Sequence, residues 1–150
     1  MDDAGPRPDE IMSEQDIKDL FARFVKAWGD ADFDGLAACV TPDFAWYLPV
    51  GPDQPHGKIL RGPDAFKIEF AAREERGVDI QFDFDDLIIK GNTIISYYVI
   101  NGTYTDGRRC SYRGVDIYEI RDRRIWSKDA YWKIISDTAV SGCVDLPVAT

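Results

Sequence analysis

The hydrophobic period of this chain changes at Gly77, and that change constrains the fold more than any other feature of the sequence. Before Gly77 the apolar residues recur mainly at helical spacing. Directly after it, in the stretch VDIQFDFD at residues 78–85, apolar residues alternate with polar or acidic ones. Strict alternation is typical of a β-strand with one buried and one solvated face. The chain therefore divides into a mainly helical first part and a second part made of strands.

Three helices are predicted before Gly77. Ser13 has the form of an N-cap with an acidic residue three positions on, and it precedes a run of apolar residues at helical spacing that ends at Gly29. A shorter amphipathic helix follows Asp32. The third helix is expected over residues 62–77, where a proline suits the first turn and a glycine the end.

Turn signals separate the expected strands. A short strand is predicted at residues 43–51, and a Pro-rich loop follows it. After the third helix, the dipeptides Gly91-Asn92 and Asp106-Gly107 mark hairpins. The strands around these turns are expected from residue 78 onward and at residues 93–105, 108–121 and 124–135.

This order of elements predicts an α+β fold. Three N-terminal helices would pack on a strongly curved, mainly antiparallel sheet, and the sheet would curl around the long first helix to enclose a cavity. The 150 residues suit one domain. We expect that domain at residues 13–135, after an acidic, Pro-rich and disordered lead-in at residues 1–12 and before a C-terminal tail at residues 136–150.

The net charge of −9 excludes several classes of partner. A nucleic acid would be repelled, and so would an anionic membrane surface. No apolar run approaches the roughly 18 residues that a membrane-spanning helix needs, and the N-terminus lacks the apolar region of a signal peptide. We therefore expect a cytoplasmic protein with no nucleic-acid or membrane partner.

The cysteines and the single histidine argue against a metal site. Cys39, Cys110 and Cys143 are odd in number and lack C-x-x-C spacing, so neither a zinc site nor a disulfide framework is expected. His56 has no evident companion ligands, and a metal site needs several that converge. A Gly-rich phosphate loop is also lacking. We expect no metal and no cofactor.

Three stretches of the chain carry a resemblance to a known fold: FARFVKAWGDADFDGLAACVTPDFAWYLPVG, LRGPDAF and RGVDIYEIRDRRIWSKDAYWK. Taken in this order, they resemble the NTF2-like superfamily, in particular its SnoaL-like and ketosteroid-isomerase-like members, over residues 13–135. The resemblance implies an α+β cone whose cavity holds a small hydrophobic molecule, and a homodimer that packs through the outer sheet face. Known activities are mostly cofactor-free isomerisation, dehydration, aldol-type cyclisation and epoxide hydrolysis, while some members only bind or scaffold.

The resemblance to ketosteroid isomerases extends to one of three polar positions. In those enzymes an aspartate base precedes a Pro-Val-Gly sequence, and here Leu48 stands at that position. A tyrosine of their first helix is matched by Phe24. Their third group is an aspartic acid kept neutral by its apolar site, and its match is Asp116. Ketosteroid isomerisation itself is therefore not expected.

Asp116 is the first candidate for chemistry. Strand alternation puts it on one face with Tyr112, Gly114 and Tyr118. An aspartate in a strand is usually a solvated surface carboxylate. The resemblance instead places Asp116 on the cavity side, where it would act in proton transfer.

The turn before the last strand decides which residue faces Asp116, because directly opposed residues of an antiparallel pair point the same way. A three-residue turn sets Asp116 opposite Lys128, whereas a turn of two or four residues sets it opposite Asp129. We hypothesise an inward Asp116–Lys128 pair, and the alternative is a solvated lysine. The resemblance favours this register, with four residues of the last strand inward: Trp126, Lys128, Ala130 and Trp132.

Three further polar residues have alternative interpretations. His56 is either an ordinary residue of the Pro-rich loop or a base at the mouth of the cavity, because imidazole suits proton transfer near neutral pH. Tyr97 and Asn101 share one face of the 93–105 strand, and we expect that face to look inward. Asparagine is disfavoured inside strands, which suggests that Asn101 makes a specific hydrogen bond.

Together these residues predict an enzyme that moves protons without metal or cofactor: an isomerase, a lyase of the dehydratase or aldol type, or a cyclase. Its substrate would be a small, hydrophobic, ring-containing molecule. Asp116 is the predicted proton donor or base, Lys128 its modulator or an oxyanion stabiliser, and His56 a third catalytic candidate. The alternative is a ligand-binding or scaffold protein of the same fold. The predicted substrate-binding residues are Asn101, Tyr97, Tyr112, Trp28, Trp46, Phe24, Leu48 and Trp132.

Overall fold

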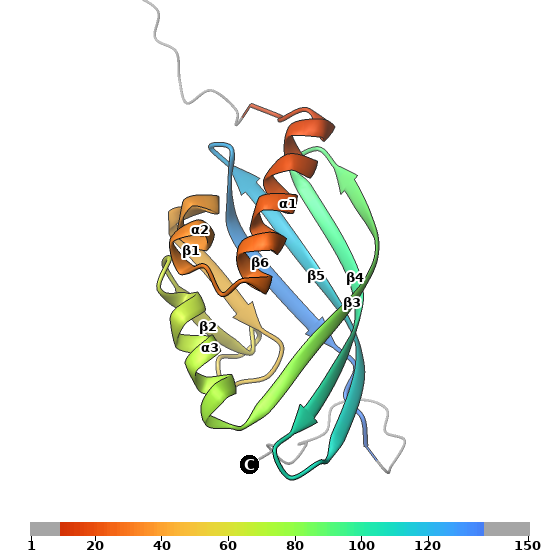
Figure 1. Cartoon of the computed structure of the whole chain (residues 1–150). Helices are drawn as coiled ribbons and strands as arrows, with labels where there is room; N and C mark the ends of the chain where they lie inside the picture. The colour runs from red at the N-terminus through yellow and green to blue at the C-terminus, as the bar shows by residue number, and fades with distance from the viewer. Residues whose placement is uncertain (1–9, 137–150) are drawn as a thin grey trace, which may run out of the picture.

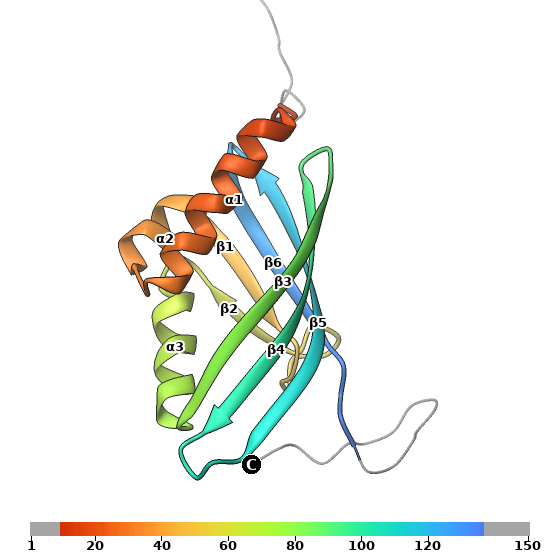
Figure 2. The same cartoon turned by 45° about the vertical axis from the view of Figure 1, so that its right-hand side comes forward.

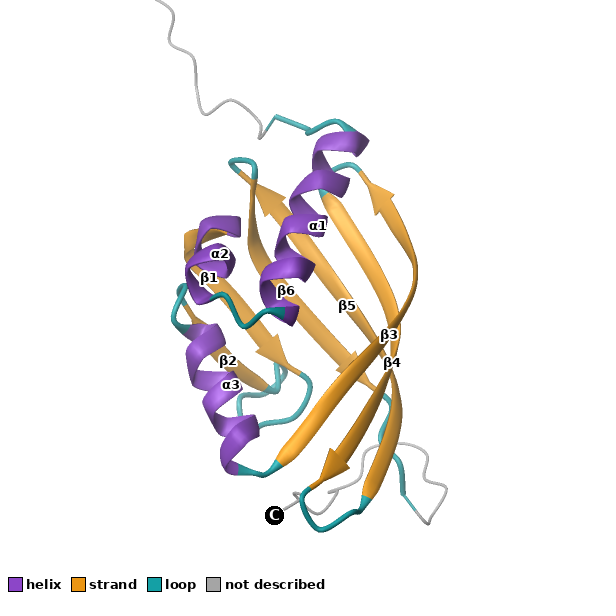
Figure 3. Ribbon diagram, in the orientation of Figure 1, coloured by secondary structure: helices purple, strands orange, loops and turns teal. Residues whose placement is uncertain are grey.

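The computed structural model describes residues 10–136, which form helices and strands in the order shown in Figure 1. The helices lie on one side of a single sheet, as the colouring of Figure 3 makes clear. The elements are α1 (Glu14–Gly29), α2 (Phe33–Cys39), β1 (Val40–Leu48), β2 (Lys58–Arg61), α3 (Ala65–Glu75), β3 (Val78–Lys90), β4 (Thr93–Tyr104), β5 (Arg109–Arg121) and β6 (Arg124–Trp132).

The first two helices begin where the sequence predicts. The side chain of Ser13 accepts a hydrogen bond of 3.1 Å from the backbone N–H of Asp16, and it caps α1. The side chain of Asp32 accepts one of 2.9 Å from the N–H of Gly35 and caps α2. Such caps satisfy amide groups of the first turn that have no partner within the helix.

The six strands form one sheet in the order β2-β1-β6-β5-β4-β3. The strands β3 to β6 are an antiparallel meander, and β1 runs parallel to β6 and antiparallel to β2. The predicted α+β order and the mainly antiparallel sheet are therefore confirmed. No strand is predicted at β2, because its four residues lie inside the Pro-rich segment and are too few to show a period.

The sheet curves, and the helices fill its concave side. Figure 2 shows α1 lying across this side, with α3 beside β1 and β2. Phe24 of α1 packs edge-on against Tyr118 of β5, with ring centroids 5.7 Å apart. Phe66 of α3 stacks on Phe44 of β1 at 5.3 Å. These aromatic contacts join the helices to the sheet in one core.

Tyr97 and Asn101 lie on the outer face of the sheet, so the prediction that they look inward is wrong. The side chain of Tyr97 is exposed, and the amide of Asn101 donates a hydrogen bond of 2.9 Å to Asp83 on the outer face of β3. The inner face of β4 is taken instead by even-numbered residues, among them Ser96 and Tyr98.

The loop between β4 and β5 explains the difference. The backbone N–H of Tyr104 donates to the carbonyl of Arg108 at 2.9 Å, which leaves a loop longer than the two residues of a simple Asp-Gly turn. One added loop residue exchanges the faces that pair. Even-numbered residues of β4 therefore face even-numbered residues of β5, and Ser96 lies opposite Asp116.

The β5–β6 pair brings Asp116 and Lys128 to the same face, although neither predicted register occurs. The turn between the strands has two residues, which alone would have turned Lys128 to the other face. A bulge at Trp126 then adds one residue to β6. Beyond the bulge, Tyr118 faces Lys128 and Asp116 faces Ala130.

The residues just before α1 are tied to the turn between β3 and β4. The backbone N–H of Met12 donates to the side-chain oxygen of Asn92 at 3.0 Å, and Met12 is buried. The amide of Asn92 donates to the carbonyl of Glu10 at 3.2 Å. Residues 10–12, expected within the disordered lead-in, are thus held in place. The predictions for residues 1–9 and 137–150 lie outside the described residues.

Among the helices of the described range, none has the length and apolar character needed to cross a membrane.

Candidate active site

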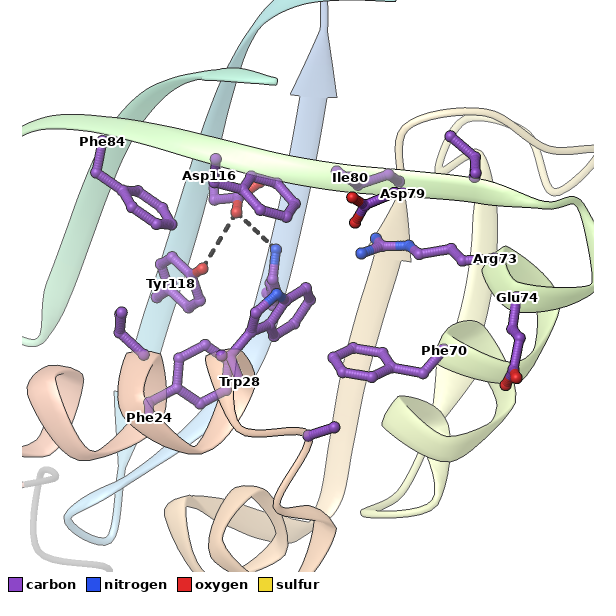
Figure 4. A pocket seen from close by; sticks show the side chains of 16 residues that line it. Phe24, Trp28, Phe70, Arg73, Glu74, Asp79, Ile80, Phe84, Asp116 and Tyr118 are labelled. Atoms are coloured by element: carbon purple, nitrogen blue, oxygen red, sulfur yellow. Dashed lines mark hydrogen bonds and ion pairs between the residues drawn. The ribbon is translucent and has the colours of Figure 1, made fainter. Parts of the chain in front are cut away.

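A cavity of about 560 Å³ opens between the helices and the inner face of the sheet. Figure 4 shows side chains from α1, α3, β3 and β5 converging on it. Its lining is largely aromatic and aliphatic, with a few charged groups, as is usual for sites that bind small organic molecules. The lining residues are Phe24, Val25, Trp28, Gly29, Ala31, Phe70, Arg73, Glu74, Val78, Asp79, Ile80, Phe82, Phe84, Asp116, Tyr118 and Lys128.

Asp116 lies at the floor of this cavity and is only 3% exposed. Its carboxylate accepts three hydrogen bonds: 2.6 Å from the hydroxyl of Tyr98 to Oδ1, 3.1 Å from the hydroxyl of Tyr118 to Oδ2, and 2.6 Å from the Nζ of Lys128 to Oδ2. Figure 4 shows the last two as dashed lines. A buried carboxylate needs such partners, because burial without them is costly.

The neighbouring Gly114 makes room for Tyr98 to reach Asp116. A Cβ atom at residue 114 would lie 2.4 Å from Cε2 of Tyr98 and 3.0 Å from Cδ1 of Trp132. The indole N–H of Trp132 donates to the hydroxyl oxygen of Tyr98 at 2.9 Å. A chain of hydrogen bonds therefore runs from Trp132 through Tyr98 to Asp116 and fixes the orientation of the carboxylate.

Lys128 pairs with Asp116 in aromatic surroundings. Its Nζ lies 5.3 Å from the ring centroid of Trp28, 5.1 Å from that of Trp46 and 5.3 Å from that of Tyr118. Burial lowers the pKa of Lys128, and the carboxylate of Asp116 opposes that effect. The ammonium group therefore gives up its proton more readily than that of an exposed lysine.

The two tyrosines beside Asp116 are held in their neutral form. Burial raises the pKa of Tyr98 and of Tyr118 above the usual value, and the negative charge of Asp116 raises both further. Tyr118 also lines the cavity, whereas Tyr98 is not among its lining residues. Its single O–H donates to Asp116, so Tyr118 helps to fix the carboxylate at the edge of the cavity.

The structure brings four of the predicted site residues to the cavity. Asp116, Lys128, Phe24 and Trp28 all line it. Trp46 is buried behind this lining, with its ring against Trp28 at 5.3 Å. The hypothesised contact between Asp116 and Lys128 is present, although the two residues are diagonal neighbours rather than register partners.

Other predicted site residues lie elsewhere. His56 is exposed, with its ring 5.0 Å from that of Tyr47, and it is not among the residues that line the cavity. Its placement at the cavity mouth was wrong, because the loop folds back against β1. Tyr112 stacks on Trp132 at 6.4 Å, beyond the lining, and Leu48 is buried in the core. The outward Tyr97 and Asn101 are also absent from the lining.

The sequence does not predict three residues of the site as site residues: Tyr98, Tyr118 and Arg73. Tyr118 shares the face of Asp116 by simple alternation, so the sequence held a signal for it. The sequence does not single out Tyr98, because the expected inward face of β4 carries Tyr97 and Asn101, and the structure turns the opposite face inward. Arg73 was missed because an arginine near the end of a polar helix gives no sign of burial. Its side chain is only 11% exposed, and its Nε lies 3.2 Å from Oε1 of Glu69.

Over residues 10–136, no group of three or more histidine, cysteine or acidic side chains is arranged to hold a metal ion.

Comparison with known proteins places this site in a family. The sequence model of the SnoaL-like domain matches residues 21–128, which is most of the chain. The chain belongs to the SnoaL-like family. The fold on which the cavity is built is that of the NTF2-like superfamily. A comparison with curated proteins gives no match.

Solved structures similar to this SnoaL-like chain share its fold at low sequence identity. An NTF2-like protein from Burkholderia xenovorans is 20% identical, with a TM-score of 0.67 over 81% of this chain and 92% of that one. A putative polyketide cyclase from Xanthomonas campestris is 22% identical, with a TM-score of 0.66 over 79% and 91%. A LEH-like epoxide hydrolase of M. tuberculosis is 18% identical, with a TM-score of 0.61 over 79% and 84%. The fold thus occurs in enzymes of more than one class.

Proposed function

We propose that this SnoaL-like protein is a cofactor-independent acid/base enzyme that acts on a small, ring-containing hydrophobic molecule in the cavity. One observation carries the proposal: the Asp116 carboxylate is buried at the floor of a largely apolar cavity and borders it together with Lys128 and Tyr118. Titratable groups gathered and desolvated in a cleft are typical of catalytic sites.

Asp116 is the proposed base. A substrate carbon or hydroxyl group next to its carboxylate would lose a proton to it, and negative charge would develop on a substrate oxygen. Lys128 would stabilise that oxygen, since it lines the cavity and its ammonium group has donors beyond the one that Asp116 accepts. The lowered pKa of Lys128 also suits it to return a proton. Proton transfer by a positioned side chain contributes about 10²–10⁴-fold to a rate.

Tyr98 is proposed as a positioning residue. It does not line the cavity, but it holds Oδ1 of Asp116 at 2.6 Å and is itself held by Trp132. Locking a carboxylate in one rotamer keeps its other oxygen aimed at the substrate. Loss of Tyr98 would therefore reduce the rate without removing a reacting group.

The proposed reaction is an isomerisation, a dehydration or aldol-type lyase step, or a cyclisation. Each of these can begin with removal of a proton next to a carbonyl group, which needs a base and an oxyanion stabiliser. The description of one similar structure as a putative polyketide cyclase fits this class. The apolar rings of Phe24, Trp28 and Phe82 favour a flat hydrophobic substrate.

A second candidate function is ligand binding without catalysis. The observation in its favour is that Asp116 already accepts three hydrogen bonds from protein groups. The hydrogen-bonding capacity of such a carboxylate is satisfied without a substrate. In this case the cavity would hold its ligand unchanged.

We also propose a homodimer that packs through the outer sheet face. Tyr97 of β4, Val115 of β5 and Tyr131 of β6 are register neighbours and form a row across this face. Tyr97 is 42% exposed and Tyr131 is 53% exposed. Exposed apolar and aromatic rows of this kind favour contact with a second surface.

Deuterium exchange tests the proposed enzyme class without knowledge of the natural substrate. The protein is incubated in D₂O with a panel of cyclic and aryl ketones, and mass spectrometry follows deuterium uptake next to the carbonyl. An acid/base enzyme of this class should exchange at least one ketone faster than buffer does. If ketones bind by calorimetry but none exchanges, the binding function is favoured instead.

A further inference from the structure

Arg73 is an unusual arginine because its charged group is enclosed by aromatic rings on the cavity wall. Its Cζ lies 5.5 Å from the ring centroid of Trp28, 5.7 Å from that of Trp46, 5.8 Å from that of Phe70 and 6.0 Å from that of Phe82. The planar guanidinium group is thereby fixed against flat surfaces, and cation–π attraction compensates part of its lost hydration.

The hydrogen-bonding capacity of Arg73 is mostly unused. Its Nε donates to Oε1 of Glu69 at 3.2 Å, and this is its single hydrogen bond to protein groups in residues 10–136. A guanidinium group has five N–H donors. The terminal Nη groups of Arg73 therefore have donors left for a partner that the described chain does not supply.

Within the described chain, the one carboxylate in ion-pair contact with Arg73 is not its partner alone. Glu69 is shared, since Arg76 also reaches the same Oε1 at 3.3 Å. At the floor, Asp116 and Lys128 neutralise each other. Two arginines thus share one glutamate, and Arg73 is the arginine that borders the cavity.

Two carboxylates at the rim, Asp79 and Glu74, also line the cavity. Among the described residues, Glu69 is the one carboxylate with an oxygen atom within 4.0 Å of a nitrogen atom of Arg73. Asp79 and Glu74 lie farther from Arg73. Figure 4 shows Arg73 pointing into the cavity from α3, whereas Asp116 enters from β5. A single ligand in the cavity can therefore meet both groups at separate points.

We infer that Arg73 binds an anionic oxygen group of the ligand, so that the substrate class is a ring-containing carboxylate. The carboxylate would take the free edge of the guanidinium group in paired hydrogen bonds, and the ring would lie among the aromatic side chains with its reacting part toward Asp116. The assignment of a reaction to this ligand rests on the proposed function, but its binding does not.

Isothermal titration calorimetry with two matched probes tests this inference. The probes are 2-naphthoate and 2-naphthamide, which share a ring system and differ in charge. The wild-type protein should bind the carboxylate more tightly than the amide. In Arg73→Met the carboxylate should bind at least about tenfold more weakly, as expected for loss of charge-assisted hydrogen bonds. The affinity for the amide should stay within about twofold.

Arg76→Met is the matched control, because Arg76 lies on the same helix and contacts the same Glu69 but does not line the cavity. It should leave both affinities unchanged. Arg73→Lys keeps the charge and loses the planar pair of donors, so its affinity for the carboxylate should fall between those of wild type and Arg73→Met.

Three results would overturn the inference. The wild-type protein could bind the two probes equally well, or it could fail to bind the carboxylate. Arg73→Met and Arg76→Met could also lose the same amount of affinity for the carboxylate. These titrations measure binding and need no turnover. Carboxylate binding can therefore be absent while ketone exchange is observed, and carboxylate binding can be observed while ketone exchange is absent. Failure of the ligand class and failure of the proposed enzyme class are thus separate results.

Discussion

Lys128 reaches Asp116 diagonally across two strands: its Nζ lies 2.6 Å from Oδ2 of Asp116, although the register partner of Asp116 is Ala130. Both side chains are buried, at 6% and 5% exposure. The lysine side chain is long enough to span this offset, and the aromatic rings around it leave the carboxylate as its polar partner. The ion pair is therefore the centre of the site.

Removal of one partner should destabilise the protein more than removal of both. Asp116→Asn leaves Lys128 as a buried cation without a counter-charge, which typically costs about 3–5 kcal/mol of unfolding free energy. Lys128→Met should be similarly costly, because it leaves the carboxylate unpaired. The double variant Asp116→Asn/Lys128→Met should recover most of the loss. Urea denaturation of the four proteins measures this cycle, and additive losses would contradict it.

The cost of Asp116→Asn should also depend on pH. Burial already places the pKa of Lys128 below its unfolded value, and loss of Asp116 lowers it further. Between the folded and unfolded pKa values the unfolded chain binds the additional proton, so stability rises with pH in that window. The variant should therefore lose less stability at pH 10 than at pH 7. A loss that grows between these two pH values would be inconsistent with a buried lysine.

Tyr98 and Tyr118 should resist ionisation in alkali. Their pKa values are raised above the usual 10, first by burial and then by Asp116. Because the folded values lie above the unfolded ones, the neutral phenols contribute stability that is complete below pH 10 and is lost as pH rises above it. Absorbance at 295 nm should show a group of tyrosines that ionises only on unfolding. In each of the variants Tyr98→Phe and Tyr118→Phe, one tyrosine fewer should ionise only on unfolding.

Gly114→Ala should disturb the site through sterics alone. The added methyl carbon would lie 2.4 Å from the ring of Tyr98, so that ring or the strand must move. Overpacking of this kind costs about 1–3 kcal/mol, and it should weaken the bond between Tyr98 and Asp116. Gly29→Ala is the control, since a Cβ there meets nothing within 4 Å. Equal thermal stability of the two variants would show that Tyr98 adapts.

The proposed dimer can be tested on its outer face. Tyr131→Glu and Tyr97→Glu each place a charge in the exposed aromatic row, and each should convert a dimer to a monomer in light scattering. The control is Asp79→Asn at the cavity rim, which should leave the mass unchanged. A monomeric wild-type protein at micromolar concentration would rule out the proposed dimer.

The sequence predicts the fold well because its signals are local. The helix cap at Ser13, the helix start after Asp32 and the alternation after Gly77 each depend on neighbouring residues, and all three occur as expected. Asp116 was also recognised as an inward candidate, from alternation together with the family resemblance. Features set by a few residues in sequence can be inferred from those residues alone.

The missed features depend on how strands and helices meet. The bulge at Trp126 and the longer β4–β5 loop each change which face a residue occupies, and neither has an unambiguous sequence signal. The predicted pair of Asp116 and Lys128 occurs because the bulge offsets the short turn. Arg73 is buried by contacts from three other elements, which no local pattern encodes.

The most direct test of the account is the rate of ketone deuterium exchange in Asp116→Asn relative to wild type, measured on the fraction that circular dichroism shows to be folded. Asp83→Asn is the control, because Asp83 is an exposed aspartate on the outer sheet face. We expect the exchange rate to fall about 100-fold or more in Asp116→Asn and to stay unchanged in Asp83→Asn. Exchange by Asp116→Asn within about threefold of wild type would show that Asp116 is not the base.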